Sequence, residues 1–490
     1  MIKRILRNSS WLSVAAAFEL GLGMVVTAVL ARRLGPTGFG QYSLWLAFIA
    51  FFTPLYDFGL TAFSLREVAQ NPQDASRFLR AVVTTKIFLS VLGLLVVVSL
   101  AYGLDYFVTP LSGIAFLLLA VSQIVRTFSL LNRAVFRAHE WMRLQAYVEA
   151  VGNLVRLLLI LGVVLVSPDL VWVCLVLAVV NFGEFLASST IIQIRARKLS
   201  PPVSTDSGDN KYETRQLLKG STPFALYDVL NGLYMRADTV LVGTIAGLQA
   251  VAWYSSAYKL ATLIGLIPRT LMDGVYPIFC KESQERVYQL VHKLLIVLLY
   301  AAFPICLSIT LFAPEIIRLI YGAQYVPAIQ ALQILAWASF FVSGSSLLLV
   351  TLNALHLEKT VAKVMAVISI TGLIAYALSI SIWGYIGACV VSTSIEAAGF
   401  LLMFIAVSRR LAHPLLSLRS VAGLLAVCGT MVTIAWLVAN TTWKLTSLIA
   451  AFLIYLPLAL CEINRTTGIL RFFHNTRAGR FLRSVVSPAK

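Results

Sequence analysis

Runs of about 20 mostly apolar residues recur along almost the whole chain, and this pattern limits the fold more than any other feature. A run of that length crosses a bilayer as a helix, because a helix satisfies its own backbone hydrogen bonds where no water is present. Only 12% of the 490 residues are charged, whereas soluble domains carry roughly 25%. The sequence therefore predicts an all-α polytopic membrane protein, with no space between the runs for a soluble domain of ordinary size.

The spacing of the apolar runs predicts about fourteen transmembrane helices, six of them before a polar connector and the others after it. The expected spans lie near residues 11–31, 40–62, 81–102, 110–131, 144–166, 170–192, 221–246, 250–276, 291–312, 329–352, 361–382, 385–407, 421–438 and 445–460.

The polar connector contains Pro201-Pro202 and a mixture of Ser, Asp and Gly, which cannot lie in lipid. It divides the chain into the domains that we expect. These are an N-terminal six-helix lobe over residues 1–194, a cytoplasmic linker over 195–220, a C-terminal six-helix lobe over 221–410, two additional transmembrane helices within 411–462, and a basic cytoplasmic tail over 463–490.

Lysine and arginine are distributed unequally between alternate loops of the predicted topology. Nearly all of them fall on one side, and the other side receives only Arg32, Arg33, Arg318 and Lys444. The positive-inside rule then places both termini in the cytoplasm. We expect the chain to lie in the cell inner (cytoplasmic) membrane. The same scatter argues against nucleic acid as a partner despite the net charge of +18, because no basic domain gathers the charge.

The two halves contain a matching motif. Leu34-Gly35 followed by Tyr42 has the same spacing as Ala246-Gly247 followed by Tyr254. An even number of predicted spans separates the two copies, so they run through the membrane in the same direction, as in parallel-repeat transporters. We therefore expect two pseudo-symmetric lobes.

Charged residues inside a span are costly and are functional candidates by default. In the fifth span Glu149, Asn153 and Arg156 occur at i, i+4 and i+7 and share one helical face. This face is either the polar wall of a transport cavity, with Arg156 contacting phosphate or sugar, or an intrahelical Glu149–Arg156 brace.

In the seventh span Asn231 and Asp238 share a face, and Arg236 points elsewhere. An arginine fork suits a pyrophosphate well. Arg236 is therefore a substrate-binding candidate, as is Asn231. The alternative is a bridge between Arg236 and Asp238 that stabilises the lobe.

Arg126 and Lys259 are further cations at helical depth for an anionic headgroup. The alternative for Arg126, as for Lys86, is that its side chain extends to the lipid headgroups.

Four carboxylates, those of Glu19, Glu149, Glu184 and Asp228, are candidates for proton or sodium coupling. Glu19 and Asp228 head the two lobes and can face each other across a cavity. Apart from this coupling ion we expect no cofactor and no metal, because the six cysteines include no CxxC pair and no histidine lies at zinc-ligand spacing.

Three stretches resemble a known family. LARRLGPTGFGQYSLWLAFIAFF with DFGLTAFSLREVA (residues 30–69), RADTVLVGTIAGLQAVAWYSSAYKL (236–260) and APEIIRLIYGAQYVPAIQALQIL (313–335) are similar to the polysaccharide transporters, the Wzx-type O-antigen flippases. The resemblance implies the fold of the multidrug and oligosaccharidyl-lipid exporter superfamily, in which two six-helix lobes surround a central cavity. It also implies alternating access and movement of polyprenyl-pyrophosphate-linked oligosaccharide from the inner to the outer leaflet. The implied partners are that substrate, membrane lipids and other polysaccharide assembly proteins.

Two other functions stay open at this point. A multidrug exporter of the same superfamily would carry cations, so a net negative cavity would favour it and a net positive one would favour a pyrophosphate lipid. A membrane enzyme of lipid-linked sugars, a polymerase or a glycosyltransferase, usually needs a large loop for its substrate. Since the loops here are short and the connector has no Gly-rich phosphate motif, we expect a transporter and not an enzyme.

Overall fold

A computed structural model describes the chain except for residues 1, 71–74, 107–108, 168, 200–212, 412–414, 417, 440–443 and 468–490. Most of the polar connector and most of the basic tail therefore lie outside the described residues. Within the described residues the regular structure is entirely helical, as predicted. In the part of the chain that the structure describes, seven helices are long and apolar enough to cross a membrane.

The helices of the first part of the chain are α1 (Ile2–Phe51), α2 (Thr53–Asp57), α3 (Leu60–Gln70), α4 (Ala75–Gly103), α5 (Pro110–Ala138), α6 (Met142–Val166) and α7 (Leu170–Leu199). After the connector follow α8 (Thr214–Ala246), α9 (Leu248–Ile264), α10 (Leu266–Phe279), α11 (Gln284–Ile320), the short 3-10 helix η1 (Ala323–Tyr325), α12 (Ala328–Ala354), α13 (Glu358–Leu411), α14 (Leu418–Ala439) and α15 (Lys444–Thr467). Helical segments occupy all the expected spans, and the predicted all-α membrane fold is confirmed.

The matching motifs of the two halves have the same backbone conformation. Gly35 bends α1 with φ 67° and ψ 178°, and Gly247 ends α8 with φ 88° and ψ 175°. This region of φ and ψ is essentially restricted to glycine, because a Cβ clashes there. The repeat read from the sequence therefore corresponds to a repeated helix break.

Two expected spans are interrupted where the sequence predicted continuous helices. The span near 40–62 breaks after α2, where Phe58 and Gly59 both have positive φ. A Cβ on Gly59 would lie 2.5 Å from the backbone nitrogen of Ala225 on α8, so the break lets two backbones approach closely. The span near 250–276 is divided at Gly265 into α9 and α10. The hydropathy of the sequence alone does not predict such interruptions within an apolar run.

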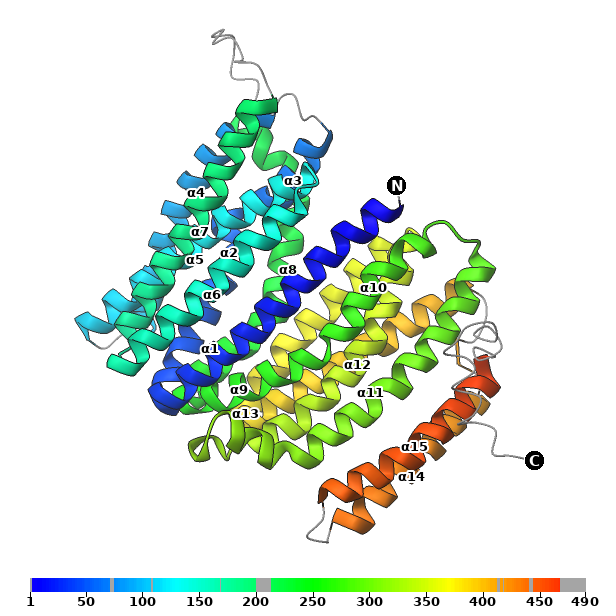
Figure 1. The fold of residues 1–490 in the computed structure, drawn as a ribbon. Coiled ribbons are helices and arrows are strands. Elements are labelled where there is room, and N and C mark those ends of the chain that lie inside the picture. The colour runs from blue at the N-terminus through cyan, green and yellow to red at the C-terminus, as the bar shows by residue number, and fades with distance from the viewer. Residues whose placement is uncertain are drawn as a thin grey trace. The chain divides into compact units, whose positions relative to one another are not determined.

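The chain forms two compact units, which we describe separately (Figure 1). Unit 1 contains residues 1–256, 320–325 and 376–385, and unit 2 contains the remainder. Helix α8 therefore packs in unit 1, against α1, α2 and α3. Gly243 of α8 allows this packing, because a Cβ there would collide with Leu44 of α1. Gly40 of α1 allows a close approach to the start of α9, because a Cβ there would collide with the carbonyl of Leu248. The division into two six-helix lobes stays a prediction.

Unit 2 contains a large apolar core and the two additional helices. Its main cluster includes Val291 and Leu295 of α11, Leu347 of α12 and Val407 of α13. A second cluster packs α14 and α15 against α11. The hydroxyl of Tyr455 on α15 donates to the carbonyl of Tyr300 on α11 at 2.7 Å, which anchors the pair of helices. The two helices run beside each other (Figure 1).

Candidate functional site

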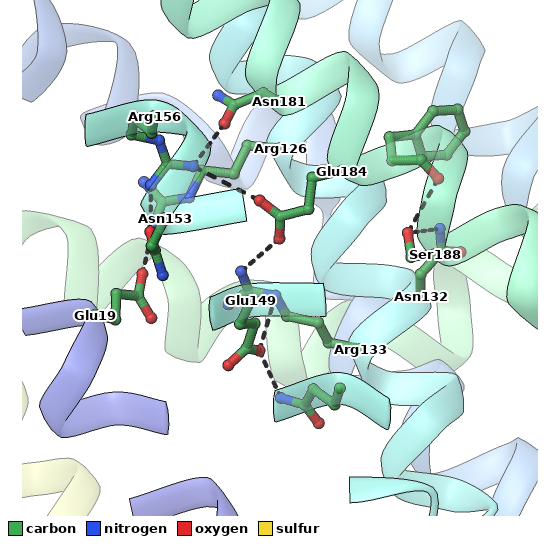
Figure 2. Close-up of polar contacts among 12 residues, drawn as sticks. Glu19, Arg126, Asn132, Arg133, Glu149, Asn153, Arg156, Asn181, Glu184 and Ser188 are labelled. Carbon is green, nitrogen blue, oxygen red and sulfur yellow. Dashed lines mark hydrogen bonds and ion pairs between the residues drawn. The ribbon is translucent and has the colours of Figure 1, made fainter. Parts of the chain in front are cut away.

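Four helices of unit 1 contribute to one polar network inside the helix bundle (Figure 2). It contains three arginines, three glutamates and two asparagines. We call it the arginine–glutamate network, and its members are Glu19 of α1, Arg126 and Arg133 of α5, Glu149, Asn153 and Arg156 of α6, and Asn181 and Glu184 of α7.

Arg133 lies at the centre of the network. Its guanidinium is 2.7 Å from Glu184 and 3.1 Å from Glu149, so one cation compensates two carboxylates. The expected span near 110–131 leaves Arg133 in the loop that follows it, and this is wrong, because Arg133 lies within α5, which continues to Ala138. A signal was available, since Ser122, Arg126 and Arg133 occur at i, i+4 and i+11 and therefore share a helical face.

Arg156 is held mainly by neutral oxygens. It donates to the side-chain oxygens of Asn153 at 2.7 Å and Asn181 at 3.0 Å, and its distance to Glu184 is 3.6 Å. Asn181 in turn donates to Ser122 Oγ at 2.8 Å, which fixes the amide orientation. The polar face predicted on α6 is present.

Glu149 is paired across the bundle and not along its own helix. Besides its contact with Arg133, it accepts a hydrogen bond from Gln145 at 2.8 Å. The alternative of an intrahelical Glu149–Arg156 brace is thus replaced by pairs between helices. Closely packed helices make these pairs possible, and a Cβ on Gly152 would already contact Glu184 at 3.4 Å.

The network is not equally accessible throughout. The side chains of Glu149 and Glu184 are only 7% and 5% exposed, whereas those of Arg126 and Glu19 are 40% and 30% exposed and lie 3.5 Å apart. Arg126 therefore has an acidic partner on α1 that spacing along α5 could not reveal. Arg126 and Arg156 are also close enough to interact electrostatically.

A second charged cluster joins α2, α3, α4 and α5. Lys86 is fully buried and donates to Asp57, to Thr61 Oγ1 and to the carbonyl of Thr127. The alternative that Lys86 extends to the lipid headgroups is therefore wrong. Asp228 of α8 is half buried and interacts electrostatically with both Asp57 and Lys86.

The remaining predicted site residues do not belong to the arginine–glutamate network. Asp238 accepts hydrogen bonds from the Tyr254 hydroxyl at 2.6 Å and from the Thr239 backbone and hydroxyl groups. Arg236 and Asn231 lie on α8 with exposed side chains. Lys259 is half buried at the beginning of unit 2.

Within the residues that the structure describes, no group of three or more His, Cys, Asp or Glu side chains is placed to hold a metal ion. The chemistry that the arginine–glutamate network offers is recognition by charge and hydrogen bonding. Its most accessible members are Arg126 and Glu19, and its two most buried carboxylates, those of Glu149 and Glu184, are paired with Arg133.

Comparison with known sequences gives a family match over residues 5–283, to the model described as polysaccharide biosynthesis protein. A putative O-antigen transporter of Shigella flexneri is 21% identical over 399 residues, which cover 79% of this chain and 93% of that protein. A probable low-salt glycan biosynthesis flippase of Haloferax volcanii, Agl15, is 22% identical and covers 78% of this chain and 79% of its own length.

Comparison with solved structures identifies the fold. The lipid II flippase MurJ in an inward closed conformation aligns with a TM-score of 0.67 at 15% identity, over 92% of this chain and 98% of that chain. An inward-facing multidrug resistance MATE transporter of the MOP superfamily aligns with a TM-score of 0.60 at 14% identity, over 80% of this chain and 94% of that chain. The architecture is that of this group of membrane transporters.

Proposed function

The chain belongs to the polysaccharide biosynthesis protein family, and from this we propose that it is a flippase for polyprenyl-pyrophosphate-linked oligosaccharide. The substrate moves from the inner to the outer leaflet of the cytoplasmic membrane, for surface polysaccharide biosynthesis. Relatives described as an O-antigen transporter and a glycan biosynthesis flippase support this proposal. So does the fold, which is shared with the lipid II flippase MurJ.

The observation that carries the proposal is that the charged groups of the arginine–glutamate network differ in their exposure. Three arginines face three glutamates, so the formal charges balance. Two of the carboxylates, however, are almost completely buried and compensated by Arg133. An incoming headgroup therefore meets Arg126 first, with Glu19 as the only accessible carboxylate of the network, and Arg156, whose side chain is 16% exposed, interacts electrostatically with Arg126.

Arginine suits the proposed headgroup. A guanidinium presents several N–H donors in a planar fork, and its hydrogen bonds to phosphate oxygens are shorter and stronger than neutral ones. Arg126 and Arg156 come from neighbouring helices and lie close enough to repel each other. A diphosphate placed between two such cations relieves that repulsion. Asn153 and Asn181 hold Arg156 in position for this contact.

The same arrangement disfavours export of cationic drugs. A cation would need accessible acidic groups, and Glu149 and Glu184 are already paired with Arg133. A charge within the membrane cannot face lipid tails without a large cost, so the exposed part of Arg126 is expected to face water or headgroups. This supports an anionic substrate over a cationic one.

The transport cycle that we propose is alternating access between two six-helix lobes. Both termini face the cytoplasm in this proposal, and membrane lipids and other polysaccharide assembly proteins are the expected partners. Arg236, Lys259 and Asn231 are proposed as further contacts to the substrate. Coupling to a proton or sodium ion is proposed to involve Glu19, Glu149, Glu184 or Asp228.

Complementation tests the function. The gene is expressed in a strain that lacks its own flippase, and inner-leaflet lipid-linked sugar is quantified. The unmodified chain should remove the accumulated intermediate, and Arg156→Gln should abolish this activity, as should Arg126→Gln. Arg143→Gln is a matched control, because Arg143 is an exposed arginine of the same helix as Arg156. Failure with every glycan tried, together with restored efflux of cationic dyes, would contradict the proposal.

A further inference from the structure

Glu184 contacts two arginines unequally. Its Oε1 atom lies 2.7 Å from Arg133, at the distance of a strong charge-assisted hydrogen bond. Its Oε2 atom lies 3.6 Å from Arg156, which is too long for a hydrogen bond. The Glu184 carboxylate is thus held on α5 by its hydrogen bond to Arg133, and it interacts with Arg156 on α6 only through a longer electrostatic contact (Figure 2).

Arg156 is the least compensated cation of the three. Its two short contacts go to amide oxygens, which carry no net charge. The Nε atoms of Arg156 and Arg133 are both buried without a hydrogen-bond partner in the described structure, but that of Arg133 lies 3.1 Å from a Glu149 carboxylate oxygen. Arg133, in contrast, faces two carboxylates, and Arg126 faces Glu19. The guanidinium of Arg156 therefore keeps both charge and donor capacity for a further acceptor.

We propose that Glu184 acts as the counter-anion of Arg156 in the empty transporter. When a diphosphate headgroup binds, it replaces Glu184 as the anionic partner of Arg156. The inference rests on the proposed function of Arg156 as a headgroup contact and adds how that contact is regulated. Arg133 is then a positioning residue: it keeps Glu184 at a distance from Arg156 and retains the carboxylate after the exchange.

The exchange has a low cost because no buried charge is left without a partner. A carboxylate that loses its only cation inside a protein is strongly destabilised. Glu184 loses only its longer contact, and its hydrogen bond to Arg133 remains. The diphosphate gains direct hydrogen bonds to a guanidinium that is already oriented by Asn153 and Asn181.

A purely structural role of Glu184 makes the opposite prediction. If the carboxylate braces Arg156 in a binding orientation, its neutralisation weakens headgroup binding. If it competes with the headgroup, its neutralisation strengthens binding. The substitution Glu184→Gln separates the two roles. Arg133 keeps Glu149 as an ionic partner in this variant, so its charge is not left alone.

The experiment uses the purified full-length protein in detergent, with farnesyl pyrophosphate as the probe and Kd measured by calorimetry. Glu184→Gln should lower Kd about threefold to tenfold, within the usual range of coupling between residues in contact. Arg133→Gln should raise Kd by a similar factor, because Glu184 then moves onto Arg156. The double variant Arg133→Gln/Glu184→Gln should restore the wild-type Kd or a lower one.

A matched double variant makes the rescue specific. Arg133→Gln/Glu149→Gln removes the other carboxylate of Arg133, which is not in contact with Arg156. It should leave Kd raised. Equal rescue by both double variants would mean that unpaired charge in the bundle, and not competition for Arg156, sets the affinity, and this would overturn the inference.

The outcomes also distinguish this inference from the proposed function. If Arg156→Gln leaves Kd unchanged, the headgroup site itself is wrong. If Arg156→Gln abolishes binding while Glu184→Gln raises Kd or leaves it unchanged, Glu184 is a brace, and only the counter-anion role is overturned.

Arg133→Lys retains the charge and should bind within about twofold of wild type. Should Arg133→Gln not yield monodisperse protein, the direction of the Glu184→Gln change decides.

Discussion

Lys86 on α4 and Asp57 at the end of α2 form a fully enclosed ion pair beside the break between α2 and α3. Thr61 completes the arrangement, since its hydroxyl donates to Asp57 at 2.6 Å. A helix break inside a membrane leaves backbone groups that need partners. Asp57 supplies one of them by accepting from the backbone N–H of Thr61 at 3.3 Å, and Lys86 also donates to the carbonyl of Thr127 on α5 at 2.8 Å. The pair thus connects the broken helix to two of its neighbours.

Replacement of one member of this pair should destabilise the protein strongly. Lys86→Met leaves Asp57 as an uncompensated buried charge, a change that typically costs about 3 to 5 kcal/mol. The double variant Lys86→Met/Asp57→Leu removes both charges and should recover most of the loss. Thermal unfolding in detergent, followed by size-exclusion chromatography, measures both. Arg77→Met is the control, because Arg77 is exposed on the same helix. A double variant no more stable than Lys86→Met would contradict this account.

Tyr254→Phe should destabilise unit 1 by about 1 to 3 kcal/mol, the cost of leaving a buried acceptor without its donor. The Tyr254 hydroxyl is 2.6 Å from Asp238, and both residues are buried. Tyr227→Phe provides the comparison, since Tyr227 lies exposed on α8. The measurement is the apparent melting temperature of the purified protein, and equal values for the two variants would exclude the proposed importance of this hydrogen bond.

The repeated helix breaks can be tested with alanine. Gly35→Ala and Gly247→Ala place a Cβ at positive φ and should each cost about 1 to 3 kcal/mol. Gly21→Ala should be neutral or stabilising, because Gly21 is within α1 and a Cβ there contacts nothing within 4 Å. Melting temperatures report the difference. Similar values for all three variants would mean that the breaks tolerate side chains.

The orientation of the chain is open to a labelling experiment. In a cysteine-free background, Arg33→Cys should react with a membrane-impermeant maleimide in intact spheroplasts, because the positive-inside rule places the exposed Arg33, next to the bend of α1 at Gly35, outside the cytoplasm. Ser207→Cys in the connector should react only in inverted vesicles. The reverse pattern would show that both termini lie on the other side of the membrane.

Much of the architecture could be predicted from local pattern. The apolar runs gave the positions of the helices, and the two glycine motifs gave the positions of two helix breaks. The interruptions at Phe58-Gly59 and Gly265 were missed. The break at Phe58-Gly59 allows close packing against Ala225 of α8, and hydropathy does not measure such packing.

Only one part of the candidate site could be predicted from the sequence, namely which polar residues share a helix face. Helical periodicity correctly placed Glu149, Asn153 and Arg156 on one face, because the face of a residue depends on the helix period alone. It could not identify the partners of these residues, which come from α5 and α7. Arg133 was assigned to a loop because the apolar run ends before the helix does.

Local pattern in the sequence thus accounts for the membrane environment, the helical fold, the repeated glycine motif and which polar residues share a helix face. All of these follow from hydropathy, helix period and backbone sterics, which act within a few residues along the chain. The tertiary structure alone decided that Arg133 compensates two glutamates, that Lys86 is enclosed with Asp57, and that Arg156 keeps unused charge. Ion pairs between helices depend on how those helices pack, so no spacing within one helix can report them.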